Sequence, residues 1–107
     1  MLSKLEDLNL SANKLNGSIP SDMEKLTNLV SFDIKSNFLV GTIPHSLYNL
    51  PNLQVFNIAS NELEGGIHKA IGQLVGLKIF VTSSNKITGS IPKEISSLTI
   101  LGKDYLK

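Results

Sequence analysis

The acidic side chains are the first residues of this 107-residue chain that could do chemistry, because carboxylates act as general acids, general bases and nucleophiles. Two close pairs occur, Glu6 with Asp7 and Glu62 with Glu64. Both pairs fall where we expect solvated turns, and neither has a neighbouring base or a predicted pocket. We therefore predict that the chain has no catalytic residue and is not an enzyme.

Histidine and cysteine, the usual protein ligands of zinc, do not indicate a metal site. His45 and His68 are the two histidines, and a site would need further ligands. The sequence has no cysteine, which excludes disulfides, thiolate ligands and cysteine nucleophiles. We expect neither a metal nor a cofactor.

Two sequons for N-glycosylation are present, and they begin at Asn9 and Asn16. In a secreted protein either asparagine could carry a sugar chain, although such motifs are common by chance. Both are candidate modification sites.

The balance of charge argues against several classes of partner. The chain has 10 basic and 9 acidic residues, and its basic residues are scattered singly. We therefore expect no nucleic-acid partner, since nucleic acids need clustered positive charge. No apolar stretch reaches about 18 residues, so we expect no direct membrane insertion by this segment. The N-terminus alternates apolar and polar residues, unlike a secretory signal.

A 24-residue period organises the whole chain. Three residue types show it most clearly: Asn13, Asn37, Asn61 and Asn85; Gly17, Gly41, Gly65 and Gly89; Ile19, Ile43, Ile67 and Ile91. Proline keeps the same register after the isoleucine, and His68 replaces it in the third unit, where we expect it on the surface. The sequence predicts one domain over 1–107, with repeats at 5–28, 29–52, 53–76 and 77–100 and an incomplete fifth unit at 101–107.

The spacing of apolar residues changes within each unit. Leu8 and Leu10 alternate with polar neighbours, which predicts a strand with one buried face. Met23 and Leu26 lie three apart after a proline, which predicts a single helical or 3-10 turn. Gly17 falls in the bend between, where we expect a positive φ.

One unit cannot bury its seven apolar side chains alone, so successive units must stack. Stacking predicts an α/β solenoid with a parallel sheet on one side and helical turns on the other. Phe32, Phe56 and Phe80 then form a core stack, and Thr82 is the one polar residue among the 28 inward positions. Because a carboxamide has two donors and two acceptors, we predict a buried asparagine ladder that bonds to its own turn and to the next unit. Its members are Asn13, Asn37, Asn61 and Asn85.

The unit resembles the plant-specific leucine-rich repeat, LxxLxxLxLSxNxLxGxIPxxLxxLxx. Residues 5–20 match it at every fixed position, and the resemblance extends from Leu2 to Leu101. It implies a right-handed superhelix with the parallel β-sheet on the concave face, short 3-10 or helical turns on the convex side, and a further short sheet near the Leu-x-Gly-x-Ile segment. In that family the repeats form ectodomains of receptor-like kinases and receptor-like proteins, and also secreted inhibitors of cell-wall-degrading enzymes. The resemblance therefore implies a module that recognises a protein or peptide.

The chain departs from the family at its ends. The family usually frames its repeats with cysteine-bearing caps, which are missing, and Asp104 stands at an apolar position of the fifth unit. Both ends of the apolar rows would then be bare, so we expect a fragment of a longer array, or a truncated gene product, whose uncapped repeats could associate end to end. As part of a receptor-like parent it would lie outside the cell or on the outer face of the plasma membrane.

Side chains between the buried strand positions should point to the concave face. The predicted ligand-binding residues there are Asp33, Lys35, Val55, Asn57, Ile79 and Val81. Val55, Ile79 and Val81 would form an apolar patch, which can mark a contact site. The competing interpretation is that β-branched residues favour strands anyway, and that Asp33 and Asn57 belong to the scaffold of the family.

Three functions stay open on the sequence alone. The first is a recognition ectodomain fragment of a plant receptor-like protein or kinase. The second is a secreted inhibitor of a cell-wall-degrading polysaccharide hydrolase, and the third is a scaffold fragment without independent activity. Cysteine caps, a membrane helix or a kinase domain in the flanking reading frame would distinguish them.

Overall fold

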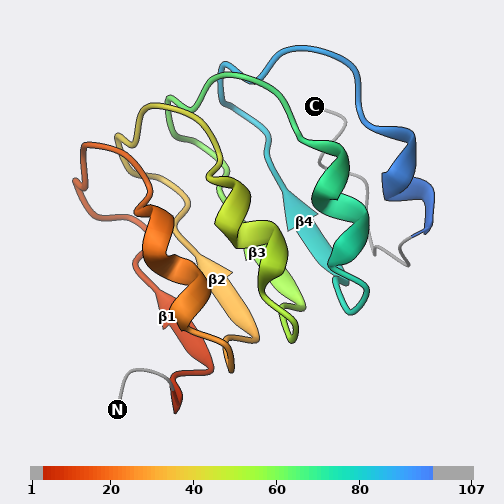
Figure 1. Cartoon of the computed structure of the whole chain (residues 1–107). Helices are drawn as coiled ribbons and strands as arrows, with labels where there is room; N and C mark the ends of the chain where they lie inside the picture. Colours follow the sequence, from red (N-terminus) through yellow and green to blue (C-terminus); the bar gives the residue numbers. More distant parts are fainter. Residues whose placement is uncertain (1–3, 98–107) are drawn as a thin grey trace.

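Within residues 4–97, four short strands form one sheet (Figure 1). The computed structural model describes residues 4–97. Strands β1 (Asp7–Asn9), β2 (Ser31–Asp33), β3 (Val55–Asn57) and β4 (Ile79–Val81) lie side by side in chain order. All neighbours run parallel, and each residue pairs with its equivalent in the next repeat, as Phe32 does with Phe56. The predicted parallel stacking of successive units is confirmed.

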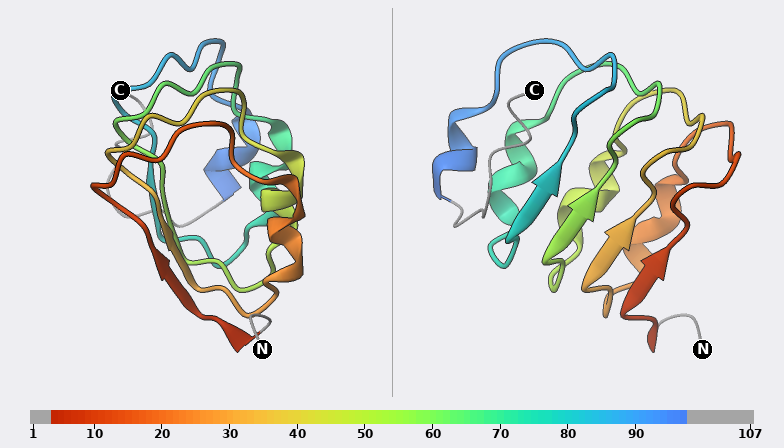
Figure 2. Two further views of the ribbon diagram at one scale, coloured as in Figure 1. Left: turned by 90° about the vertical axis from the view of Figure 1, so that its left-hand side faces the viewer. Right: turned by 180° about the vertical axis from the view of Figure 1, so that it is seen from behind.

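Short 3-10 helices lie on the opposite side of the solenoid from the sheet (Figure 2). They are η2 (Ser21–Lys25), η3 (His45–Asn49), η4 (Lys69–Gln73) and η5 (Lys93–Ser97). Pro20 and Pro44 precede the first two with φ of −62° and −63°, the value that the proline ring imposes. The helical turns predicted after the prolines are therefore confirmed. No helix within residues 4–97 is long and apolar enough to cross a membrane.

The core lies between the sheet and the helices and consists of rows of like side chains. The Phe32 and Phe56 rings stack with centroids 6.0 Å apart, and the Phe56 and Phe80 rings with centroids 5.5 Å apart. All three rings are buried, as is Leu53 in the neighbouring row. The predicted core stack of phenylalanines is confirmed. Thr82, the polar exception, is buried as well.

The first repeat is less well covered than the repeats that follow. Leu10 and Leu15 keep 40% and 39% of their surface exposed. Their equivalents in the third repeat, Ile58 and Leu63, are fully buried. Among the described residues, the apolar row of the first repeat is therefore more open to solvent than that of the third. The last apolar position of the fourth unit, Leu98, lies outside the described residues.

Two backbone positions in each bend have a positive φ. One is the predicted glycine, with φ between 78° and 85° at Gly17, Gly41, Gly65 and Gly89. The other was not predicted and lies directly before the asparagine, with φ between 56° and 59° at Ala12, Ser36, Ser60 and Ser84. A left-handed conformation costs a residue with a Cβ roughly 1–2 kcal/mol. Its return in all four repeats indicates that other contacts hold this turn.

A second set of hydrogen bonds joins the repeats beyond the bend. The Val40 N–H donates to the carbonyl of Gly17 (2.9 Å), and the Glu64 N–H donates to the carbonyl of Gly41 (2.8 Å). Ser18 and Val40 also form an isolated parallel bridge. The further short sheet that the resemblance implied is thus a hydrogen-bond ladder with one bridge in the described part of the chain.

The asparagine of each bend ties two repeats together. The Asn61 Nδ2 donates to the carbonyl of Ile34 in the preceding repeat (3.0 Å) and to carbonyls of its own turn. Its Oδ1 accepts from the Leu39 N–H, also in the preceding repeat (3.1 Å). The expectation that the asparagines reach the next unit is wrong, because Asn37, Asn61 and Asn85 all bond to the unit before them. Asn13 is not part of a buried ladder, since it is exposed and bonds only within its own turn.

Candidate functional site

The exposed face of the sheet is the surface on which the sequence predicts a ligand (Figure 2, right). Two rows of side chains stand on it, at the first and third residue of each strand. The first row is Asp7, Ser31, Val55 and Ile79, and the second row is Asn9, Asp33, Asn57 and Val81. Because the strands pair in register, each row is continuous from β1 to β4.

The apolar residues of these rows gather on two neighbouring strands. Val55 is the register partner of Ile79, and Val81 stands opposite Asn57. Ile79 is 38% exposed, and both valines are half-buried. We call Val55, Ile79 and Val81 the β3/β4 patch. The structure therefore brings the three predicted apolar residues together and leaves them open to solvent.

The polar side chains of the second row also accept hydrogen bonds from the backbone just after each strand. The Asp33 Oδ1 accepts from the Lys35 N–H (3.1 Å), and the Asn57 Oδ1 accepts from the Ala59 N–H (3.1 Å). This local bond is one that Asp and Asn side chains favour, and it supports the interpretation of both as scaffold residues. Asp33 keeps a second oxygen and its charge, and the exposed Lys35 follows two positions later. Val81 cannot make the bond, so the fourth strand differs in chemistry from the other three.

The two sequons lie in different surroundings. The Asn9 Oδ1 accepts from both the N–H (3.0 Å) and the hydroxyl (2.7 Å) of Ser11 on the concave face. Asn16 is exposed in the bend before Gly17, away from the sheet. A sugar on Asn9 would therefore cover part of the first strand, whereas a sugar on Asn16 would leave the sheet free.

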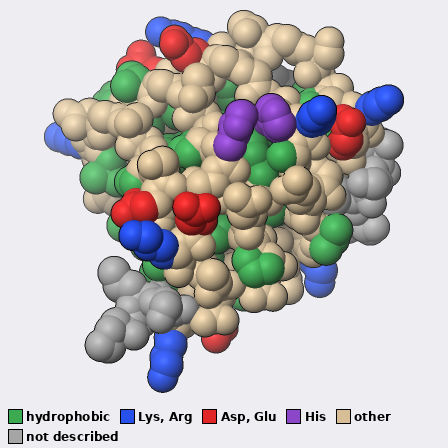
Figure 3. Space-filling model, in the orientation of Figure 1, with side chains coloured by type: hydrophobic (Ala, Val, Ile, Leu, Met, Phe, Trp, Pro, Cys, Tyr) green, Lys and Arg blue, Asp and Glu red, His purple; other side chains and the backbone are tan. Residues whose placement is uncertain are grey.

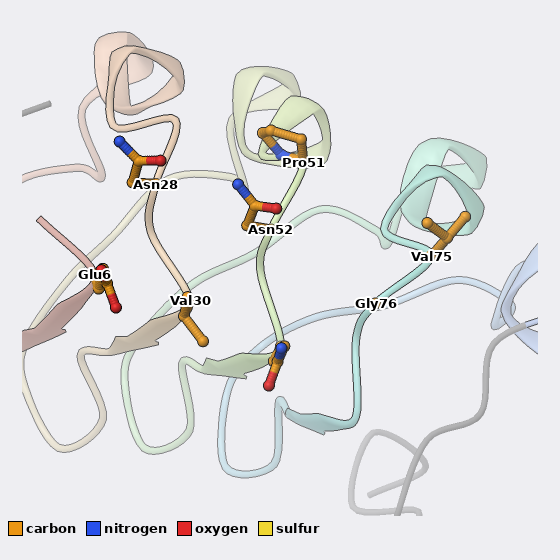
Figure 4. A pocket seen from close by; sticks show the side chains of 8 residues that line it. Glu6, Asn28, Val30, Pro51, Asn52, Val75 and Gly76 are labelled. Carbon is orange, nitrogen blue, oxygen red and sulfur yellow. The ribbon is translucent and has the colours of Figure 1, made fainter. Parts of the chain in front are cut away.

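A groove that the sequence did not predict lies at the edge of the solenoid (Figure 4). We call it the edge groove, and its volume is about 430 Å³. Its lining includes Glu6, Val30 and Gln54 from the starts of three strands, and Asn52, Val75 and Gly76 from the turns after the helices. The signal that could have indicated it is Val75-Gly76, which replaces the Thr-Asn and Pro-Asn of the first two repeats.

The two histidines lie next to each other on the helical face (Figure 3), with ring centroids 4.3 Å apart. His68 occupies the proline position and is half-buried, and its Nδ1 accepts from the Ala70 N–H (3.0 Å). The buried Tyr48 lies beside them, and its hydroxyl accepts from the His68 N–H (3.3 Å). Burial raises the pKa of Tyr48 above its usual value, and the bond from His68 opposes this only in part. Within residues 4–97, no three His, Asp or Glu side chains lie close enough to hold a metal ion.

Comparisons with known proteins identify the repeat. A family model described as Leucine Rich Repeat matches residues 4–26, 28–50 and 52–74, more than half of the chain. The matched positions include the strands and the helices of the first three repeats. No curated protein matches the chain.

Several solved structures share the fold. The plant peptide hormone receptor RGFR1 in complex with RGF2 is 37% identical, with a TM-score of 0.88 over 94% of this chain and 16% of that chain. The ectodomain of the Arabidopsis receptor kinase HAESA, in complex with an IDA peptide hormone, is 36% identical, with a TM-score of 0.85 over 90% of this chain and 17% of that chain. A plant ice-binding protein is 35% identical, with a TM-score of 0.88 over 92% of this chain and 32% of that chain. The chain thus spans less than a third of each of these relatives.

The repeat period, the strand register and the family match agree with one another. Each described repeat has the same order of strand, bend and helical turn, and the structural relatives include ectodomains of plant receptor kinases. The chain belongs to the leucine-rich repeat family.

Proposed function

We propose that the chain is a recognition module that binds a peptide or another protein across the exposed face of its sheet. The observation that carries the proposal is the β3/β4 patch. Its three apolar side chains stand on adjacent strands of an open surface, where water would otherwise contact them. Removing such apolar surface from water is the main driving force of most protein association.

The fold by itself does not select this function, because one fold hosts many functions. Its relatives include receptors of peptide hormones and an ice-binding protein. The side chains distinguish these cases. The two rows on the sheet change from polar and charged on β1 and β2 to apolar on β4. A surface whose side chains change from strand to strand suits a peptide or protein ligand of mixed sequence. It suits ice less well, because an ice surface repeats regularly.

The chemistry of the face indicates what the ligand presents. An apolar side chain of the ligand would pack on the β3/β4 patch, next to the carboxamide of Asn57. Asp33 and Lys35 on the neighbouring strand would contact polar or charged groups, which contribute specificity more than affinity. The likeness to receptor ectodomains supports our proposal that the module belongs to a plant receptor-like kinase or receptor-like protein, acts outside the cell and takes part in signalling or defence.

The test uses peptides selected from a random library for binding to the intact chain. Replacing Ile79→Lys together with Val81→Asp should abolish binding of the selected peptides and leave the circular dichroism spectrum unchanged. Val40→Asp is the control, because Val40 is 45% exposed but lies outside the four-stranded sheet of β1 to β4. Binding that survives the double substitution, or that fails equally in the control, would exclude the β3/β4 patch as the site.

A further inference from the structure

The edge groove crosses the first three repeats and is separate from the concave face. Figure 4 shows it between two rows of side chains. One row consists of the residues that directly precede β1, β2 and β3, namely Glu6, Val30 and Gln54. The other row comes from the turns that follow the 3-10 helices and includes Asn52 and Val75.

The third repeat differs from the repeats before it at two positions of the groove. Gly76 stands where those repeats have Asn28 and Asn52, so one carboxamide is missing from the row. A Cβ at Gly76 would meet the Leu53 carbonyl oxygen at 3.7 Å, an ordinary contact, and its φ is outside the left-handed region. Neither space nor backbone requires a glycine here. Val75 beside it is 80% exposed.

Several polar groups of the groove remain available to a ligand. The Asn52 Nδ2 donates to the Thr27 carbonyl (3.1 Å), which leaves its Oδ1 as an acceptor. Among residues 4–97, the side chains of Glu6 and Gln54 have neither a hydrogen-bond partner nor an ion-pair partner. The row continues beyond the lining of the groove to the exposed Lys78, which directly precedes β4, so it has a negative end at Glu6 and a positive end at Lys78.

We propose that the edge groove binds a short extended peptide, with a basic side chain at the Glu6 end and an acidic side chain at the Lys78 end. The Asn52 and Gln54 carboxamides suit the main chain of such a peptide, because an amide both donates and accepts hydrogen bonds. Val30 and Val75 would contact an apolar side chain between the two charges. The opposite charges at the ends of the row fix the direction of the peptide. This site is independent of the function proposed for the concave face.

The spacing of the strands sets the length of the peptide. Parallel strands lie about 4.8 Å apart, so the strand starts of Glu6 and Lys78 are separated by about 14 Å. An extended peptide advances about 3.3 Å per residue, so the first and last of five residues are about 13 Å apart. Alternate side chains of an extended chain point the same way. The expected ligand pattern is therefore basic-x-apolar-x-acidic.

The experiment is an NMR titration of the ¹⁵N-labelled chain with acetyl-Arg-Ala-Val-Ala-Glu-amide. We expect saturable shifts of the backbone amides of Val30, Gln54 and Gly76. The matched peptide with citrulline in place of arginine keeps the shape and loses the charge, and it should bind about two- to five-fold more weakly, as expected for an exposed ion pair. Glu6→Gln should weaken the arginine peptide by the same factor and leave the citrulline peptide unchanged.

Gly76→Asn adds, at the third-repeat end of the groove, the side chain that the first two repeats carry at this position. It should weaken peptide binding and reduce the saturable shifts of Val30 and Gln54, while the rest of the spectrum stays that of the folded chain. If this variant fails to fold, the Glu6→Gln comparison still decides the outcome. Shifts that do not saturate, that map to the concave face, or that are equal for the two peptides would overturn the proposal. The concave variant with Ile79→Lys and Val81→Asp should bind the peptide normally, which separates this site from the other.

Discussion

The first and third repeats have the same backbone and closely similar apolar residues, but their side chains differ in exposure. Leu63 in the third repeat is fully buried, whereas its equivalent Leu15 is 39% exposed. Asn61 is 7% exposed, and its equivalent Asn13 is exposed. The third repeat has described neighbours on both sides, and the first repeat has one. Burial in this fold therefore comes from the neighbouring repeat rather than from the sequence of the unit itself.

The hydrogen bonds of the two repeats differ in the same way. Asn61 bonds to a carbonyl and an N–H of the preceding repeat. Asn13 donates to the carbonyls of Leu10 and Ser11 in its own turn, at 2.9 and 3.1 Å. The same residue type thus joins two repeats in one place and closes a single turn in the other. Paired substitutions in the two repeats measure how much stability comes from stacking.

The largest difference is expected for leucine. Leu63→Ala should lower the free energy of unfolding by about 2–5 kcal/mol, because it leaves a cavity between covered repeats. Leu15→Ala should cost about 1 kcal/mol, since water already reaches that side chain. Urea unfolding of both variants checks this. Equal losses would mean that exposure in the structure does not govern the stability of the repeat.

A smaller difference is expected for asparagine. Asn61→Ala should cost about 1–3 kcal/mol, because it leaves buried backbone groups of two repeats unpaired. Asn13→Ala should cost less than 1 kcal/mol, roughly the net value of an exposed hydrogen bond. The measurement is again urea unfolding, with Ser84→Ala as a control on an exposed side chain. If Asn61→Ala changes stability by no more than the control, the asparagines do not hold the repeats together.

Alanine substitutions at two bend glycines should separate the cost of backbone strain from the cost of steric crowding. Gly65 and Gly17 have nearly the same φ, 78° and 80°. A Cβ on Gly65 would lie 2.9 Å from the Thr42 Cγ2, whereas a Cβ on Gly17 would meet nothing within 4 Å. Both Ala variants should lose about 1 kcal/mol to strain, and Gly65→Ala should lose more. Combining Gly65→Ala with Thr42→Ser removes the crowding methyl and should restore the Gly17→Ala value; if it does not, crowding is not the cause.

The sequence was most informative where one property repeats. Every 24th residue has to face the same neighbour, so the period predicted the strands, the helical turns, the phenylalanine stack and the bend glycines. Features that depend on the path of the backbone were missed. The positive φ of Ser60 has no signal in its side chain, because serine rarely adopts that conformation. Whether Asn61 bonds to the preceding or the following repeat depends on which of them presents unpaired backbone N–H and carbonyl groups to its side chain. The period cannot predict this, because it is the same whether the repeats are read forwards or backwards.

The two candidate sites also differ in how far the sequence could predict them. The concave residues follow from strand alternation, so the sequence alone places Val55, Ile79 and Val81 on one face. The edge groove forms between side chains of three successive repeats, and its shape depends on how far each of them extends from the backbone. Only the change to Val75-Gly76 hinted at it. A single unusual pair of residues is a weak signal until the surrounding surface is known.

The smallest effect is expected at Tyr48, a buried position whose equivalent in the first repeat is the exposed Glu24. Tyr48→Phe should cost about 1 kcal/mol at neutral pH, because the His68 N–H loses its acceptor. Burial raises the pKa of Tyr48 above about 10, so the folded state holds the phenolic proton more tightly than the unfolded state. That contribution is complete below the unfolded pKa and is lost as the pH rises through the folded pKa. Urea unfolding at about pH 8 and about pH 10.5 should therefore show a larger loss of stability for the native chain than for the variant. Parallel losses would mean that Tyr48 titrates equally in both states and that its burial between the repeats does not oppose ionisation.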